Sequence, residues 1–282
     1  MHEVVKKIIL DLVDLKCNKF GRKSSEPNEH FLNMFIEVLS DYTKWKCLDK
    51  HVWSKYTFDN YRKKFHYWVR MGIFNDALDI IQAILNSNCV NEKSLACFID
   101  GTNIRNINGS YKRNTDKDGN TLLGRLYCDK FKRGLKVTVV ITDKNYLLNV
   151  IVSNGASHDI TVVPQIREKL KRMHKSNKKH RINIVGDKGY ISNNIKKQFA
   201  KDKMHYITPN KKNKVQPEEY LWHDKSLLKQ RHLVENYFAH IKQFTRVRLL
   251  YEKRVDIYKG FLLLAILLRS SKHIENFDSH AN

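Results

Sequence analysis

Two aspartates of this 282-residue chain each end an apolar run and stand beside a glycine. Asp100 ends the run in ACFIDGT, and Asp187 ends the run in INIVGDKGY. Short apolar runs are typical of buried strands. In open α/β sheets, the residues that bind ligands lie at the carboxyl ends of the strands. Taken singly, each aspartate is more often a turn or cap residue, so their role depends on what accompanies them.

A third acid, Glu235, lies in LLKQRHLVENYFAHIKQF, where apolar residues recur at helical spacing. The pattern predicts one long helix from about Ser226 to Phe244, on which Arg231, Glu235 and Lys242 share a stripe beside the apolar face. Alone, such a stripe is a surface ion pair worth a few tenths of a kcal/mol. Together with two strand-end aspartates, it offers the carboxylates that hold two divalent cations about 3.5–4 Å apart for in-line phosphoryl displacement.

These motifs resemble those of DDE transposases of bacterial insertion sequences, in the branch related to Harbinger elements. The resemblance covers residues 45–268. FIDGT resembles the first-aspartate motif of that family, VGDKGY resembles the second, and Arg231-x3-Glu235-x6-Lys242 matches the signature around its catalytic glutamate. The chain departs from the pattern at Leu228, where the family has a tyrosine three residues before the arginine.

The resemblance implies that Asp100, Asp187 and Glu235 are catalytic and hold two Mg²⁺ ions, for which Mn²⁺ can substitute. It implies cleavage of DNA at the ends of a mobile element, followed by attack of the freed 3′-hydroxyl on target DNA. Both steps are phosphoryl transfers that need alignment and charge neutralisation rather than a protein nucleophile. Arg231 and Lys242 either hold phosphates beside the metals or only balance Glu235, and we favour the phosphate role.

The elements that must position these acids fall into two parts. Apolar residues recur at helical spacing through the first ninety residues, whereas short apolar runs typical of strands follow from Asn91 onward. The resemblance implies an α/β catalytic part with an RNase H-like mixed sheet flanked by helices. We therefore expect a helical DNA-binding domain over residues 1–92 and an RNase H-like DDE catalytic domain over residues 93–282.

The second part contains five predicted strands and two further predicted helices. The helix over Ile160–His174 has Asp159 as a plausible cap, and the last apolar helix covers Ile257–Leu268. The pair His158-Asp159 also resembles a family motif, and an N-cap role explains it about as well. The strands, the second and third of which form a hairpin about residues 142–145, are Leu95–Ile99, Leu135–Ile141, Tyr146–Val152, Ile182–Val185 and Met204–Thr208.

Within the helical part, the stretch TFDNYRKKFHYWVRMGIFNDALDIIQAIL predicts two short helices about Met71-Gly72. This arrangement suits a helix-turn-helix, and an ordinary αα-hairpin is at least as common. Either the first helix (residues 57–70) or the second (residues 75–85) can be the one that reads bases. The basic residues expected to contact DNA are Arg62, Lys63, Lys64 and Arg70 here, and Lys171 and Arg172 in a run over residues 167–181 that holds eight Lys or Arg.

The charge of the whole chain points to a polyanion. The 52 Lys and Arg exceed the 29 Asp and Glu, which gives a formal net charge of +23. Part of the Lys excess also fits drift in an AT-rich genome. Five scattered cysteines without a CxxC indicate a reducing, intracellular compartment, and no apolar run approaches the roughly 18–20 residues that span a bilayer.

We therefore expect double-stranded DNA as the partner, both the terminal inverted repeats of an element and its target, with a homodimer or larger assembly and no membrane partner. The expected location is DNA-associated, in a bacterial cytoplasm or nucleoid, or in a nucleus or viral factory for other hosts. An active transposase is the first hypothesis. The alternatives are a captured transposase-derived DNA-binding protein, which the presence of all three acids disfavours, and a metal-dependent nuclease, which the N-terminal resemblance over residues 45–74 disfavours.

Overall fold

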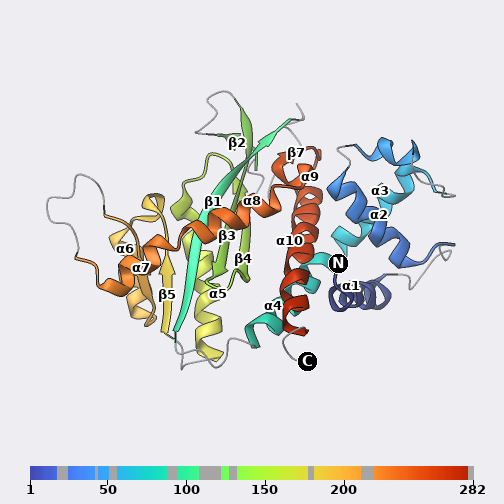
Figure 1. The fold of residues 1–282 in the computed structure, drawn as a ribbon. Coiled ribbons are helices and arrows are strands. Elements are labelled where there is room, and N and C mark those ends of the chain that lie inside the picture. Colours follow the sequence, from blue (N-terminus) through green and yellow to red (C-terminus); the bar gives the residue numbers. More distant parts are fainter. Residues whose placement is uncertain are drawn as a thin grey trace. The chain divides into compact units, whose positions relative to one another are not determined.

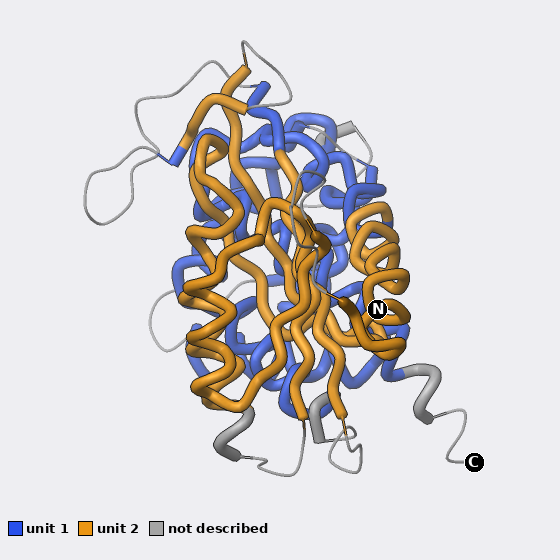
Figure 2. Tube along the Cα trace, turned by 90° about the vertical axis from the view of Figure 1, so that its left-hand side faces the viewer, with its two compact units in different colours: residues 1–85, 104–122, 240–282 blue, residues 86–103, 123–239 orange. Residues whose placement is uncertain are grey.

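The computed structural model of the chain describes residues 1–17, 25–41, 44–50, 56–87, 94–107, 122–126, 132–176, 181–210 and 219–278. The chain forms two compact units, shown in two colours in Figure 2. Unit 1 comprises residues 1–85, 104–122 and 240–282, and unit 2 comprises residues 86–103 and 123–239. The sequence predicted a single boundary after residue 92, whereas the contacts group the C-terminal segment with the N-terminal helices.

Unit 1 is helical, as the spacing of its apolar residues predicts. The last helix, α10, is longer than the predicted Ile257–Leu268, because its burial continues beyond that apolar run. Its elements are α1 (Glu3–Lys16), α2 (Asn28–Ser40), the 3₁₀ helix η1 (Trp45–Lys50), α3 (Phe58–Arg70), α4 (Ile73–Ser87), α9 (Thr245–Arg248) and α10 (Val255–Asp278) (Figure 1).

Aromatic side chains hold the helices of unit 1 together. Phe65 of α3 stacks on Phe261 of α10 with 4.2 Å between ring centroids, and Trp45 lies 5.7 Å from each of these rings. Tyr61, Phe65 and Trp68 are buried, which confirms the predicted apolar side of α3. Gly72, at a φ of 73°, makes the turn between α3 and α4, because glycine adopts this conformation without a steric penalty.

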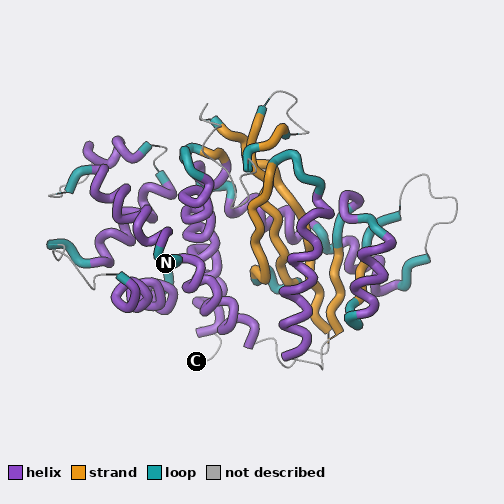
Figure 3. Tube along the Cα trace, turned by 180° about the vertical axis from the view of Figure 1, so that it is seen from behind, coloured by secondary structure: helices purple, strands orange, loops and turns teal. Residues whose placement is uncertain are grey.

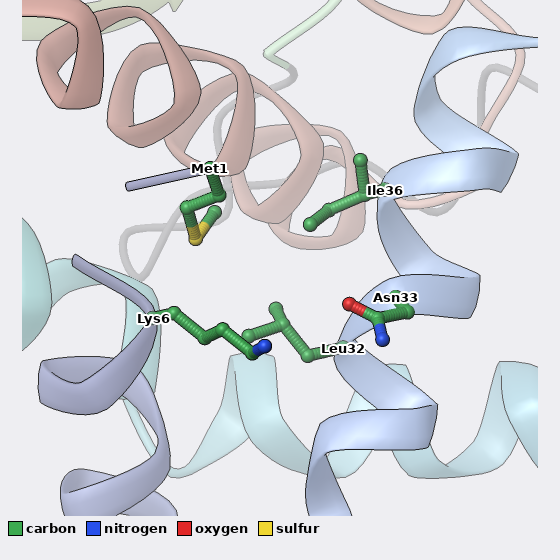
Figure 4. Close-up of a pocket in the computed structure, with 5 residues that line it drawn as sticks. All are labelled: Met1, Lys6, Leu32, Asn33 and Ile36. Carbon is green, nitrogen blue, oxygen red and sulfur yellow. The ribbon is translucent and has the colours of Figure 1, made fainter. Parts of the chain in front are cut away.

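A small pocket lies between α1 and α2 in unit 1. It has a volume of about 200 Å³ and is lined by Met1, Lys6, Leu32, Asn33 and Ile36 (Figure 4). The Lys6 ammonium is paired with Glu29 of α2. The pocket contains none of the acids that the sequence singles out.

Unit 2 is built on a mixed sheet between helices. The strand order is β4-β3-β1-β5-β6, with the short strand β2 also paired to β3; β3 and β4 are antiparallel, whereas β1, β5 and β6 are parallel. Helices α5 and α6 cover one face of the sheet and α8 crosses the other (Figures 1 and 3). The strands are β1 (Ser94–Asn106), β2 (Gly124–Arg125), β3 (Arg133–Thr142), β4 (Leu147–Asn154), β5 (Arg181–Val185) and β6 (His205–Ile207).

The predicted strands are confirmed, and one is longer than expected. The predicted β3–β4 hairpin is present, and it turns through residues 143–146, one residue later than the predicted 142–145, with Asn145 at a φ of 67°. The predicted strand Leu95–Ile99 continues to Asn106, because Arg105 and Asn106 pair with β7 (Leu249–Leu250) of unit 1. Asp100 therefore lies inside a strand rather than at its end, and Gly101 makes no turn.

The helices of unit 2 differ from the prediction at one important place. α5 (Val163–Ser176) follows a 3₁₀ turn, η2 (Asp159–Val162), and α6 covers Asn193–Lys201. The single long helix expected from Ser226 to Phe244 is two helices, α7 (Trp222–Lys229) and α8 (His232–Ile241), because residues 230 and 231 form a turn. In that turn the amides of Leu233 and Val234 bond three residues back, which tightens the chain between the two helices.

Alternate residues of β1 face the two helix layers. Leu95, Cys97 and Ile99 are buried in one apolar cluster with Ile166 of α5 and Phe199 of α6. Because successive side chains on a strand point to opposite faces, Asp100 points toward the face that α8 crosses.

Candidate active site

Asp100 lies on β1, and Asp187 lies just after the end of the adjacent parallel strand β5. The last paired residues of β1 and β5 are Phe98 and Val185, and each aspartate follows the paired residue of its own chain segment by two positions. Neighbouring strands lie about 5 Å apart, so this register brings the two acidic positions side by side. The closeness expected of the two motifs thus arises from the parallel pairing of β1 with β5.

The carboxylate of Asp100 lies in an acidic and partly buried environment. Burial raises its pKa to about 6, and the negative charges of Asp187 and Glu235 act in the same direction. The Gly101 amide, which donates to Asp100 Oδ1 at 2.8 Å, and the positive charge of Arg231 act in the opposite direction. Two acids and one arginine, from the segment after β5 and from the start of α8, therefore influence the protonation of Asp100.

Asp187 has a local structural role as well. It is the N-cap residue of the 3₁₀ helix η3 (Lys188–Tyr190), and its carboxylate accepts a hydrogen bond from the Gly189 amide at 2.8 Å. The turn or cap interpretation and the site interpretation are therefore compatible for this residue, because the cap uses one carboxylate oxygen and fixes the direction of the other.

Arg231, Glu235 and Lys242 do not share one helix, contrary to the sequence prediction. Arg231 lies in the turn before α8, Glu235 is exposed in the first turn of α8, and Lys242 follows the end of α8 in unit 1. Within the described part of the chain, the buried Nε of Arg231 has no hydrogen-bond acceptor. An arginine beside a carboxylate pair with a donor still to satisfy is suited to a phosphate oxygen.

The donor set suits a hard divalent cation. Carboxylate oxygens are the ligands that Mg²⁺ and Mn²⁺ prefer, and a dication would relieve the like-charge repulsion that helps raise the pKa of Asp100. Among the residues that the structure describes, no three His, Cys, Asp or Glu side chains converge to hold one ion. The acids therefore suit a divalent cation by their oxygen donors and their negative charge, and not by a preformed three-ligand geometry.

Two residues that the sequence did not assign to the site lie beside the acidic motifs. Lys136 of β3 is buried, and its ammonium contacts Asp159 Oδ1 at 2.9 Å. Asp159 was expected to cap a helix, but the N-cap position of η2 belongs to His158, and the Asp159 carboxylate pairs with Lys136 instead. A lone lysine inside the apolar strand LKVTVVI was the available signal, because a buried ammonium needs an anionic or hydrogen-bonding partner.

The basic residues expected to contact DNA on α3 have different surroundings. Arg62 and Lys63 are exposed and pair with Asp59, with Lys63 Nζ 2.8 Å from its carboxylate. Lys64 is half-buried, with its ammonium 5.1 Å from the ring centroid of Phe31. Less of this side chain is therefore exposed to DNA than the sequence prediction assumed. Arg70 is exposed at the C-terminus of the helix.

The two expected DNA contacts on α5 are also placed within the fold. Lys171 lies 3.5 Å from Asp202 at the end of α6, beside the closer pair that Arg167 makes with Asp202 at 2.6 Å. Arg172 is exposed, and its Nε donates to the Glu168 carbonyl. Lys171 therefore contributes to the packing of α5 against α6, whereas Arg172 presents its charge to solvent.

The chain was compared with curated proteins and with solved structures. A search of curated proteins finds no match. Among solved structures, the chain is similar to a piggyBac transposase synaptic complex with hairpin DNA, at 12% identity and a TM-score of 0.48, covering 95% of this chain and 71% of that chain. It is similar to a pre-cleavage Mos1 transpososome, at 10% identity and a TM-score of 0.28, covering 91% and 81%.

In the described segments, no helix is long and apolar enough to cross a membrane.

The family model described as the transposase DDE domain matches residues 91–269, which is more than half of the chain and includes the three acids. The chain therefore belongs to the DDE transposase family.

Proposed function

We propose that the chain is an active DDE transposase that cleaves DNA at the ends of its element and joins the freed 3′-hydroxyl ends to target DNA. The observation that carries this proposal is the matched register of Asp100 and Asp187, with Glu235 close enough to influence the proton equilibrium of Asp100. Two further negative charges that act on the Asp100 carboxylate are unfavourable unless cationic charge is supplied there. A metal-dependent phosphoryl transfer supplies that charge.

Asp100, Asp187 and Glu235 would hold two Mg²⁺ ions, or Mn²⁺ in their place. When bound, the metals would neutralise phosphate charge and activate the attacking oxygen. The protein's own contribution is alignment. The Gly189 amide holds Asp187, the Gly101 amide holds Asp100, and Arg231 offers its unsatisfied Nε to a phosphate oxygen.

An RNase H-like core is the fold that best accommodates these positions. In support, the central strand β1 carries the first acid, an antiparallel hairpin lies on one side of it, and the parallel strands β5 and β6 lie on the other. The second acid follows β5 and the third lies on α8. Membership of the Harbinger-related branch rests on the sequence motifs, including Arg231-x3-Glu235-x6-Lys242.

DNA binding is assigned to the basic surface of the protein, with α3 and α4 as a helix-turn-helix. The exposed Arg62, Lys63, Arg70 and Arg172 and the charge of +23 support this assignment. Lys242 stays a proposed phosphate contact. Because transposition joins two element ends, we propose a homodimer or larger assembly that acts on DNA inside the cell.

The test uses the purified full chain and a DNA duplex that carries the inverted repeat flanking its gene. Asp100→Asn, Asp187→Asn and Glu235→Gln should each abolish cleavage and strand transfer in Mg²⁺ while leaving binding of the duplex intact. Asp202→Asn is the matched control, because this acid of unit 2 pairs with Arg167 on α5. Strand transfer retained by any of the three variants would remove that residue from the catalytic set.

The same experiment separates the alternatives. A metal-dependent nuclease would cut unrelated duplexes as well as the repeat and would join no ends. A captured DNA-binding protein would bind the repeat with no metal-dependent cleavage in the unmodified chain. Sequence-specific cleavage followed by joining is the result expected of the transposase.

A further inference from the structure

The carboxylate of Asp159 fills the space beside two glycines, one from each aspartate motif. A Cβ atom at Gly101 would lie 3.0 Å from Asp159 Oδ1, and a Cβ atom at Gly189 would lie 2.9 Å from Asp159 Oδ2. Carbon and oxygen atoms without a bond between them rarely approach so closely. Glycine at both positions therefore leaves room for this single carboxylate.

The carboxylate of Asp159 is fixed from its other side by Lys136. The ammonium of Lys136 donates to Asp159 Oδ1 at 2.9 Å and to the Ser157 carbonyl at 2.7 Å. Lys136 lies on β3 with only 10% of its side chain exposed. A buried ammonium without these partners would be strongly unfavourable. Because Lys136 is buried, it needs the Asp159 carboxylate as its partner, and this need keeps the two side chains together.

Asp159 lies on the opposite face of β1 from the side chain of Asp100. Asp100 and Gly101 are consecutive on β1 and so point to opposite faces of the sheet, Asp100 toward the face that α8 crosses and Gly101 toward the face of α5. The space beside Gly189 is shared, because Asp187 Oδ1 would lie 3.1 Å from the same Cβ atom that meets Asp159. The Asp159 carboxylate thus lies beside both segments that carry the acids, namely β1 and the turn from β5 to η3.

The buried phenol of Tyr190 lies in the same cluster. Burial raises its pKa, and the negative charges of Asp159, Asp100 and Asp187 raise it further, in that order. Its hydroxyl and that of Thr138 would lie 3.4 and 3.5 Å from the Cβ position at Gly101, beside Asp159. The back of the acidic site is therefore closely packed around one carboxylate.

We propose that Asp159, held by Lys136, is a positioning residue that sets the separation of Asp100 and Asp187 and thereby the affinity of the site for a divalent cation. The proposal rests on the function proposed above. Asp159 acts through its shape and its pairing: it fills the gap between the β1 strand and the β5–η3 turn, while the ammonium of Lys136 offsets its charge.

The first measurement is the binding of Mn²⁺ to the DNA-free full chain by titration calorimetry, with free Mn²⁺ followed by electron paramagnetic resonance. Loss of groups that orient metal ligands typically weakens metal affinity by about 10–100-fold, and Asp159→Ala should fall in this range. Asp159→Asn keeps the shape and one oxygen acceptor for Lys136, so it should retain most of the affinity.

The matched control is Asp202→Ala, which removes another aspartate of unit 2 that pairs with a basic side chain at a similar distance, 2.6 Å from Arg167 Nε. It should leave the affinity for Mn²⁺ unchanged. Mn²⁺ binding by Asp159→Ala equal to that of the unmodified chain would overturn the proposal. Binding by Asp159→Asn as weak as that of Asp159→Ala would also overturn it, because a direct ligand role needs the carboxylate itself.

A second measurement does not depend on metal. Hydrogen–deuterium exchange of the peptide covering residues 186–191 should rise in Asp159→Ala and stay unchanged in Asp202→Ala. Unchanged exchange in Asp159→Ala would contradict the bracing role. Exchange could rise as expected in Asp159→Ala while the unmodified chain binds no Mn²⁺ and cuts no DNA. In that case the structural role of Asp159 would be supported and the proposed function would fail, so the two failures can be distinguished.

Discussion

Gly260 of α10 lies directly against Val69 of α3. A Cβ atom at position 260 would come within 2.4 Å of Val69 Cγ2 and 3.3 Å of the Phe65 ring. The close approach of the two helices in unit 1 therefore depends on the absence of a side chain, and it is what lets Phe65 stack on Phe261.

Gly260→Ala should destabilise the protein by about 1–3 kcal/mol, because overpacking forces side chains and backbone to shift. The free energy of unfolding in urea measures this loss. Shortening the opposing side chain provides the control: Val69→Ala in the Gly260→Ala background should recover part of the stability. No recovery in the double variant would mean that the methyl contact is not the cause.

Arg246 and Glu252 form a buried ion pair beneath two aromatic rings in unit 1. The Arg246 guanidinium lies 5.1 Å from the ring centroid of Trp45 and 4.6 Å from that of Phe261. Removal of one member of a buried pair typically costs about 3–5 kcal/mol, so Glu252→Gln should lower the free energy of unfolding by an amount approaching this range. The exposed pair Arg254–Asp256 is the comparison, and Asp256→Asn should cost less than about 1 kcal/mol. Equal losses would contradict the importance of burial.

His66 of α3 should make stability depend on acid. Burial lowers its pKa to about 4, and Arg62 and Arg254 act in the same direction, against an unfolded value near 6.5. The unfolded chain therefore binds more protons between these values, and stability is full above pH 6.5 and falls as the pH drops toward 4. With allowance for solvent screening, the loss is on the order of 1–2 kcal/mol.

The variant His66→Gln cannot take up this proton, so its stability should vary less between pH 6.5 and 4. Urea unfolding at a series of pH values measures the difference. His223→Gln, at an exposed position on α7, should keep the pH dependence of the unmodified chain. An unchanged slope in His66→Gln would show that other groups account for the loss.

Arg231→Ala should reduce cleavage of the element-end duplex by about 100-fold, since removal of a positioned donor from a site of developing charge typically costs that much. Binding of the duplex should change little. Lys229→Ala is the control, because this exposed lysine ends the preceding helix α7 and carries the same charge. An equal effect of the two changes would indicate general attraction of DNA rather than a placed contact.

Arg70→Ala should weaken DNA binding and lower the dependence on salt. Each phosphate contact contributes roughly −0.9 to the slope of log affinity against log salt concentration, so the slope should become shallower by about one. Fluorescence anisotropy at several salt concentrations measures it. The exposed Lys7 of α1 offers a comparison of the same charge outside the predicted DNA-binding helices. If Lys7→Ala changes the slope as much, α3 has no special part in binding.

The acidic motifs and most strands could be predicted because each depends on local pattern. Apolar runs mark β3, β4, β5 and β6, and both aspartates follow such runs. The extension of β1 past Asp100 could not be predicted from its polar residues, because it depends on pairing of Arg105 and Asn106 with a strand more than a hundred residues later. Tertiary pairing here outweighs local preference.

Two further features depended on contacts that a pattern does not reveal. No glycine or proline marks the turn at Gln230 and Arg231, so the helical spacing on either side predicted one continuous helix. The pairing of Lys136 with Asp159 joins a strand to a 3₁₀ turn that follows the next strand, and only the fold identifies the partner. A lysine inside an apolar strand indicates that an anionic or hydrogen-bonding partner is present, but it does not indicate which residue that partner is.

The discontinuous composition of unit 1 has a consequence for synthesis. Its aromatic core is complete only when α10 joins the N-terminal helices, so a nascent chain carries Phe65 and Trp45 without Phe261 until α10 has left the ribosome. The segments of unit 2 are all translated before that moment. A premature stop codon shortly before residue 255 would therefore spare Asp100, Asp187 and Glu235 and still leave the N-terminal helices without the helix that buries them.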